Sequence, residues 1–203
     1  MIEFLLASAS PRRSQILENL GIKFRLMTPP DIPEDDEMQN INLSPSQKAI
    51  ALARKKSLSV NPEDNQLVLT ADTIVAVDNE TYGKPENDDQ ARYFLKKLSG
   101  RKHQVITALA LRKGKEDPVS DFESTDVYFT KMSDSDIDWY ISTKEPFGKA
   151  GAYAIQEKGG IFIEKIDGCY FNVVGLPVFC LMKLLKQIGC YQSVVFGKMA
   201  GEM

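Results

Sequence analysis

The stretch Gln66-Leu-Val-Leu-Thr-Ala-Asp-Thr-Ile-Val-Ala-Val77 decides how this chain folds. Its two apolar runs, Leu67–Leu69 and Ile74–Val77, are typical of buried strand segments. Asp72 lies between them. An aspartate in apolar surroundings needs a cation, a hydrogen-bond network or a chemical task, because an unpaired buried carboxylate is costly. The alternative is an aspartate at a strand end that faces water.

Strands and helices alternate on both sides of this stretch, which predicts an α/β protein with a mixed sheet. Residues 2–7 predict a buried strand, and Ser10-Pro11 and Ser44-Pro-Ser-Gln47 each predict a helix start, the second with a capping box. Further helices are expected over 88–98, after Ser133, and, as the last helix, between Pro177 and Gly189. Strands are expected over 22–26, 105–111 and 126–130, and a hairpin is expected from 161–166 with 170–174.

Composition excludes several classes of protein. The 203 residues fit one large domain, and 25 basic against 28 acidic residues disfavour a dedicated nucleic-acid binder. No apolar run approaches the ~20 residues of a membrane span, and the N-terminus does not resemble a signal peptide. Three cysteines without a Cys-x-x-Cys pair disfavour disulfides and zinc ribbons, so we expect a cytoplasmic protein. The single histidine, His103, is expected at a solvated strand entrance rather than in a catalytic site.

The segment Ser8-Ala-Ser-Pro-Arg-Arg13 is a candidate anion site. It joins the first strand to a helix N-terminus, where free N–H groups and the helix dipole favour a negative charge. Two arginines in a first turn are unfavourable unless a bound polyanion offsets the repulsion. A capped surface helix with solvated arginines explains the segment equally well.

Other candidates are weaker when each is taken alone. Lys84 lies in a turn, and Lys56 is near a helix C-terminus, where lysine is favourable in any protein. The small residues of 148–156 allow a ligand to approach the backbone closely. The acidic loop that contains Glu34 is normally a solvated surface, although with Asp72 it could hold Mg²⁺ through oxygen ligands. A Walker A loop and a dinucleotide-binding Gly-x-Gly-x-x-Gly segment are both absent from the sequence.

Taken together, these motifs resemble the Maf family of nucleotide pyrophosphatases from about Phe4 to Ile188. The shared motifs, in chain order, are Ser8-Ala-Ser-Pro-Arg-Arg13, Ala71-Asp-Thr73, Gly83-Lys-Pro85, Leu98-Ser-Gly100, Lys149-Ala-Gly-Ala-Tyr153 and Val174-Gly-Leu-Pro177. The resemblance implies an elongated mixed sheet flanked by helices, with a central cleft, similar to inosine triphosphate pyrophosphatases. It implies a single two-lobed domain over residues 1–190, followed by a tail over 191–203, and a homodimer.

The resemblance also implies the site residues. Phosphate contacts fall on Ser8, Arg13, Lys56 and Lys84, and Asp72 matches the catalytic aspartate. Asp72 and Glu34 would hold the divalent cation, Mg²⁺ or Mn²⁺. The implied reaction is hydrolysis of a nucleoside triphosphate to the monophosphate and pyrophosphate.

Three positions imply the branch of the family that acts on dTTP and UTP: Arg12, Thr73 and Gln156. One departure lies beside the last of them, because Ala154 and Glu157 stand where the family usually has glycines. The residues also bear on two other functions. The three cations with Asp72 disfavour a nucleotide-binding regulator of cell division without turnover. The acidic net charge and the single tryptophan disfavour a single-stranded nucleic-acid binder.

Overall fold

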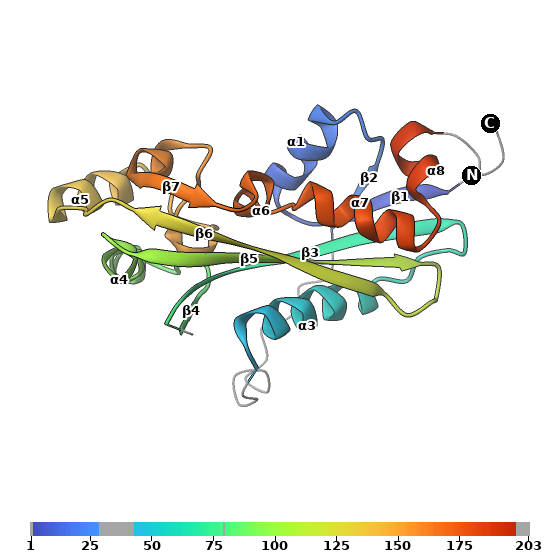
Figure 1. The fold of residues 1–203 in the computed structure, drawn as a ribbon, viewed down its shortest axis with the longest axis horizontal. Helices are drawn as coiled ribbons and strands as arrows, with labels where there is room; N and C mark the ends of the chain where they lie inside the picture. Colours follow the sequence, from blue (N-terminus) through green and yellow to red (C-terminus); the bar gives the residue numbers. More distant parts are fainter. Residues whose placement is uncertain (1, 29–42, 79, 198–203) are drawn as a thin grey trace.

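The chain folds around one long, twisted sheet, shown in Figure 1. The computed structural model describes residues 2–28, 43–78 and 80–197. Within them the seven strands follow the order β2-β1-β3-β5-β6-β7, and β4 also pairs with β3. The strands are β1 (Glu3–Ala7), β2 (Arg25–Met27), β3 (Gln66–Val77), β4 (Glu80–Tyr82), β5 (Lys102–Lys113), β6 (Val119–Phe129) and β7 (Ile163–Asp167).

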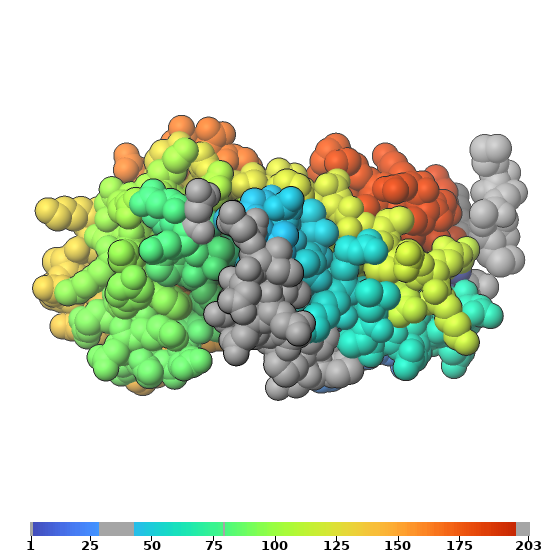
Figure 2. Space-filling view, turned by 90° about the horizontal axis from the view of Figure 1, so that it is seen from below, coloured from blue at the N-terminus to red at the C-terminus, as the bar shows by residue number. Residues whose placement is uncertain are grey.

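Helices flank this sheet on both sides. In Figure 1, α3 lies below the sheet, and α1, α6, α7 and α8 lie above it. Figure 2, seen from below, shows the cyan α3 segment on the surface of this face. The mixed α/β class and the flanking helices are thus confirmed. The helices are α1 (Pro11–Asn19), α3 (Pro45–Leu58), α4 (Asp88–Leu98), α5 (Asp134–Ser142), α6 (Tyr170–Val174), α7 (Val178–Gln187) and α8 (Tyr191–Phe196), with 3₁₀ turns η1 (Ala150–Ala152) and η2 (Lys158–Phe162).

The pairing of β3 leaves one stretch of its edge open. On one side β5 accompanies β3 from Leu67 to Ala76. On the other side β1 pairs in parallel with residues 66–69, and β4 pairs antiparallel with residues 75–77. Among the described strands, none covers residues 70–74 on that side. This open edge contains Asp72 and Thr73.

Side-chain alternation along β3 assigns these residues to two different layers. Ile74 packs with Ala49, Leu52 and Ala53 of α3 beneath the sheet. Leu67, Leu69 and Ala71 pack into the larger core above the sheet, with residues from α1, α7 and α8. By the same parity Asp72 points toward α3, and Thr73 points toward α1.

Local helix signals in the sequence are accurate. Ser44 accepts the N–H of Gln47, whose side chain accepts the N–H of Ser44, so the expected capping box is present. α3 then runs from Pro45 to Leu58. Ser133 caps α5 with a second such box, closed by Asp136.

Two predictions about the C-terminal third are wrong. Residues 170–174 form α6 rather than the second strand of a hairpin, because the helical backbone carries the polar side chain of Asn172 into the core, where its hydrogen bonds are satisfied. The helix that starts after Pro177 is followed by another, α8, whose Val194 is buried in the core above the sheet. The domain limits at residues 1–190 stay a prediction.

The prediction for His103 is also wrong. Its side chain is only 1% exposed, and its ring packs edge-on against Phe129 and Tyr153, with centroids 4.9 and 5.4 Å away. Its neighbour Lys102 begins β5 and is exposed, so strand alternation turns His103 inward. Burial lowers the pKa of His103 to about 4, which keeps the ring neutral.

None of the helices in the described ranges combines the length and the apolar character needed to cross a bilayer.

Candidate functional site

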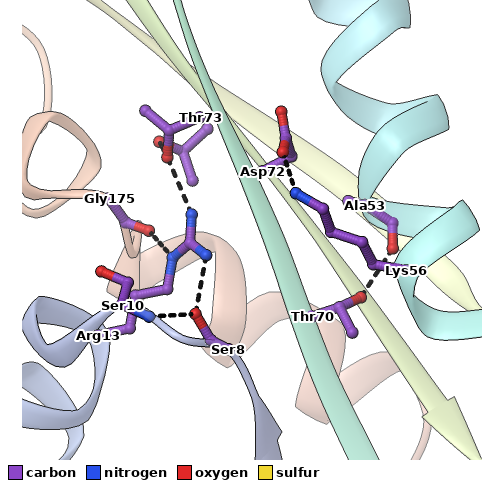
Figure 3. A network of polar contacts seen from close by, with 10 residues as sticks. Ser8, Ser10, Arg13, Ala53, Lys56, Thr70, Asp72, Thr73 and Gly175 are labelled. Atoms are coloured by element: carbon purple, nitrogen blue, oxygen red, sulfur yellow. Dashed lines mark hydrogen bonds and ion pairs between the residues drawn. The ribbon is translucent and has the colours of Figure 1, made fainter. Parts of the chain in front are cut away.

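Asp72 meets a lysine from α3 on the lower side of β3. The Nζ atom of Lys56 lies 2.5 Å from Oδ1 of Asp72. The Asp72 side chain is about nine-tenths buried, whereas that of Lys56 is 31% exposed. Thr70, two residues before Asp72, donates to the carbonyl of Ala53 at 2.8 Å. This bond ties α3 to β3 one turn before Lys56, and Figure 3 shows both contacts on the same side of the strand.

Arg13 lies on the other side of the same strand. Its Nε donates to the carbonyl of Gly175 (2.8 Å), one Nη to Ser8 Oγ (3.0 Å), and the other to Thr73 Oγ1 (3.1 Å). Figure 3 shows the guanidinium enclosed by these three oxygens. The three acceptors belong to the loop after β1, to β3 and to the end of α6, so the tertiary fold, and not the helix of Arg13, sets its direction.

The positive charge of Arg13 has no carboxylate bonded to it among the described residues. All three of its acceptors are neutral oxygens. Burial lowers the pKa of Arg13 to about 10, and the negative charge of Asp72 opposes this shift. The guanidinium stays protonated at neutral pH. It has five N–H groups, of which the three bonds occupy three, so donors remain for an anion.

Ser8 is a hydrogen-bond donor to any ligand at this edge. Its Oγ accepts both from Arg13 and from the backbone N–H of Ser10, at 3.2 Å. A serine hydroxyl has one proton and two lone pairs, so these two bonds leave its proton to donate. The Ser8 side chain is buried beside the cation.

Lys84 follows β4, at the other end of the open edge. Tyr82 pairs with Val75, so a ladder continued by two residues would set Lys84 opposite Thr73. The carbonyl of Gly83 accepts the N–H of Gly151 at 3.0 Å, which ties the Lys84 turn to the loop of residues 148–156. Gly151 has a φ of +68°, and a Cβ there would lie 2.8 Å from Val75 Cγ2, so a glycine is required at this contact. The Lys84 side chain is exposed.

Arg12 lies within electrostatic reach of the same loop. Burial lowers its pKa, and the carboxylate of Glu157 opposes that shift. Glu157 also lies 3.5 Å from the Nζ of Lys149, which donates to the carbonyl of Glu145 at 2.7 Å. Gln156, next to Glu157, is exposed. The carboxylate of Glu157 therefore links the loop that carries Gln156 to Arg12 by an electrostatic interaction.

The structure thus gathers most of the predicted site residues around one strand. Arg13 contacts both Ser8 and Thr73, and Lys56 and Asp72 form a pair on the opposite side of β3. Glu34 lies outside the described residues. Within the described ranges no group of three or more histidine, cysteine, aspartate or glutamate side chains is arranged to hold a metal ion.

Sequence reasoning missed two buried residues at this site, Thr107 and Asn172. Thr107 Oγ1 lies 3.0 Å from Thr73 Oγ1, and Asn172 accepts the backbone N–H of Thr107 at 3.1 Å. Asn172 is fully buried. The signal that singled out Asp72, a polar side chain within an apolar run, is also present in Phe171-Asn-Val-Val174.

Known proteins resemble this chain over most of its length. Residues 3–188 match the family described as Maf-like protein. A dTTP/UTP pyrophosphatase of Alkaliphilus oremlandii is 46% identical over 191 residues, covering 92% of this chain and 96% of the relative. Another, of Caldicellulosiruptor bescii, is 44% identical over 195 residues, covering 93% of this chain and 96% of the relative.

A solved structure of a HAM1 protein from Coxiella burnetii covers 65% of this chain and 75% of its own, with a TM-score of 0.46 and 20% identity. At that score the likeness supports no conclusion about the site. The match to residues 3–188 and the identities of 44% and 46% do not depend on it. On these grounds, the chain belongs to the Maf-like protein family.

Proposed function

We propose that this protein hydrolyses dTTP and UTP to the nucleoside monophosphate and pyrophosphate. The names of its relatives at 44% and 46% identity support the reaction. The observation that carries the proposal is the arrangement at the open edge of β3. Arg13, which is hydrogen-bonded only to neutral oxygens, lies on one side of the strand, and the Lys56–Asp72 pair lies on the other.

The triphosphate is held by charge and by hydrogen bonds. Arg13 offers a cation that is hydrogen-bonded to no carboxylate of the described chain, and Ser8 offers a hydroxyl proton beside it. Lys84 adds an exposed cation at the other end of the edge. Charge-assisted bonds from a fixed guanidinium are well suited to phosphate oxygens.

Asp72 is the catalytic residue of the proposal. Lys56 is the cationic partner of this carboxylate in the absence of a ligand. The carboxylate orients a water molecule and accepts its proton as the water oxygen bonds to the α-phosphorus. The bond from this phosphorus to the oxygen that bridges to the β-phosphorus breaks, and pyrophosphate leaves. Arg13, Lys56 and Lys84 stabilise the charge on the phosphate oxygens.

The proposal includes a divalent cation, Mg²⁺ or Mn²⁺. Asp72 fits such an ion as a hard oxygen ligand, and Glu34 is the second ligand we propose. Mg²⁺ usually binds one or two carboxylates together with substrate phosphates and water, so the lack of a complete ligand cluster among the described residues agrees with a cation that arrives with the nucleotide. When bound, it would neutralise phosphate charge and act as a Lewis acid.

Arg12, Thr73 and Gln156 select the pyrimidine base in this proposal. A side chain that hydrogen-bonds the correct base edge rejects a wrong base strongly, because buried polar groups would otherwise be left unpaired. Glu157 adds a carboxylate within electrostatic reach of Arg12, so it tunes the same contact. We further propose that the enzyme is a homodimer of the cytoplasm.

A pyrophosphate-release assay tests the reaction. We expect release from dTTP and UTP with Mg²⁺ or Mn²⁺, and much slower release from CTP, GTP and 7-methyl-GTP. Each nucleotide is also tested for binding. Binding of dTTP or UTP without release of pyrophosphate from any nucleotide would contradict the proposal and support a nucleotide-binding regulator instead.

A further inference from the structure

A buried chain of hydrogen bonds leads from α6 to Arg13. Asn172 is fully buried, and its amide nitrogen donates to the carbonyl of Val105 (2.8 Å) and to Thr125 Oγ1 (2.9 Å). Its side-chain oxygen accepts the N–H of Thr107 at 3.1 Å. These bonds fix the orientation of the amide, because a flipped amide would set oxygen against the carbonyl and nitrogen against the N–H.

The direction of the remaining bonds follows from counting protons. Thr107 Oγ1 donates its single proton to the backbone carbonyl of Asn172, 3.0 Å away. In its 3.0 Å contact with Thr73, Thr107 therefore accepts and Thr73 donates. The hydroxyl proton of Thr73 is thus used inside the protein. Toward Arg13, at 3.1 Å, Thr73 can only accept.

We propose that Asn172 and Thr107 are positioning residues for the reaction, because through Thr73 they fix the guanidinium of Arg13 that grips the triphosphate. The catalytic part of this inference rests on the proposed function. The inference also changes the part that Thr73 plays. With its proton engaged by Thr107, Thr73 influences the choice of nucleotide through Arg13 and not as a donor to the base.

The hydrogen-bond relay compensates for the weak bonds that hold Arg13. Arg13 is held by neutral oxygens alone, so its charge is left for the ligand, but neutral bonds hold less firmly than a carboxylate would. A relay whose members all have their donors and acceptors satisfied compensates for this, because such buried networks are rigid. A misplacement of about 1 Å can lower a rate by about a hundredfold.

Substitution at Thr107 tests the relay. In Thr107→Val the side chain keeps its shape, but both hydroxyl bonds are lost, so we expect kcat/KM for dTTP and UTP to fall about ten- to a hundredfold. Thr107→Ser restores the hydroxyl, and its kcat/KM should lie within about threefold of the native value. A purely structural role would lower the melting temperature of the valine variant and leave kcat/KM unchanged below it.

The control is a hydroxyl outside the site. Ser99 accepts the N–H of Met132 and donates to its carbonyl, so Ser99→Ala also removes two hydrogen bonds. Its kcat/KM should stay within twofold of native. If Thr107→Val is folded and equals native in kcat/KM while Arg13→Lys is impaired, the relay does not position Arg13, although the proposed function stands.

A measurement on the native protein keeps the inference testable if Thr107→Val does not fold. In proton–nitrogen NMR spectra the two Nη groups of Arg13, assigned by their loss in Arg13→Lys, should give separate signals, because the bonds to Ser8 and Thr73 prevent rotation of the guanidinium. Thr107→Ser should preserve this separation. A single averaged signal in the native protein would overturn the inference. This readout does not depend on turnover, so an averaged signal would overturn the relay even if no nucleotide is hydrolysed.

Discussion

Asp72 and Glu145 are the two buried carboxylates of the described chain, each 8% exposed, and they are held in opposite ways. Asp72 is paired with one lysine, whose side chain reaches solvent. Glu145 accepts from Tyr140 Oη (2.7 Å) and from the backbone N–H groups of Gly159 (2.9 Å) and Lys158 (3.0 Å). One carboxylate has a single charged partner on a long side chain, and the other has three neutral partners on rigid structure.

The difference fits the catalytic role proposed for Asp72 and a structural role for Glu145. A lysine that is partly solvated can leave Asp72 and bind a phosphate instead, which frees the carboxylate for water or a cation. The donors around Glu145 have no such freedom. A Cβ at Gly159 would lie 2.4 Å from Tyr140 Oη, so a glycine is required for this close approach, and the raised pKa of Tyr140 keeps its hydroxyl a donor. Glu145 thereby fixes the start of η2, just after Gln156.

The largest expected effect is on catalysis at Asp72. In Asp72→Asn, pyrophosphate release should fall by about 10²- to 10⁴-fold, because the amide cannot accept a proton from water. The melting temperature should hardly change, because Lys56 can be hydrated once its partner is neutral.

The matched control for this variant is Asp126→Asn, which also removes an acid paired with a lysine, Lys102, 2.9 Å away. It should keep its rate within twofold. Full activity of the folded Asp72→Asn variant would show that Asp72 is not the catalytic carboxylate.

The next effect concerns acid stability in the half of the molecule that contains Glu145. The pKa of His103 is about 4 in the folded chain and 6.5 in the unfolded chain, so below pH 6.5 only the unfolded chain binds the proton. The contribution of His103 to stability is complete above pH 6.5 and is lost as the pH falls to 4. It amounts to about 3 kcal/mol. Urea unfolding at a series of pH values measures it.

The control replaces the histidine by a side chain that does not titrate. His103→Gln can still hydrogen-bond to Tyr153 and should show a pH dependence weaker by the same amount. If the native protein and His103→Gln lose the same stability as the pH falls, groups other than His103 cause the acid sensitivity.

Glu145→Gln should affect stability and not chemistry. The glutamine amide would set an NH₂ group against a backbone N–H that now donates to the carboxylate, so the free energy of unfolding should fall by about 1–3 kcal/mol. The rate constant kcat should change much less than in Asp72→Asn. Denaturant unfolding and the pyrophosphate assay, run on the same samples, measure both. A loss of rate as large as that of Asp72→Asn, without loss of stability, would place Glu145 in the reactive group.

The smallest effect is expected at the helix that delivers Lys56. Ser44→Ala removes the cap of α3 and should lower stability by about 1 kcal/mol. The rate should stay within twofold, because the bond from Thr70 to Ala53 still ties α3 to β3. Thermal unfolding and kcat/KM are compared with Ser133→Ala, which removes the matching cap of α5. A drop in kcat/KM for Ser44→Ala alone would show that Lys56 depends on the helix start.

Features that depend on near neighbours could be read from the sequence. The capping boxes at Ser44 and Ser133 close over three residues, so their residue types suffice to place the helix starts. Asp72 was conspicuous because a carboxylate within an apolar run requires a partner somewhere. Family membership was also readable, because the matching motifs stand in order along the chain.

Which partners meet was decided only by the tertiary structure. Arg13 is bonded to the carbonyl of Gly175, 162 residues away, and the register of β3 decides that Asp72 faces α3 while Thr73 faces α1. The sequence predicted a strand at 170–174 and a solvated His103, and both predictions are wrong for the same reason. A hydrogen bond or a ring contact between distant segments is specified by the packing of whole layers, and this packing leaves no local pattern in the residues that it joins.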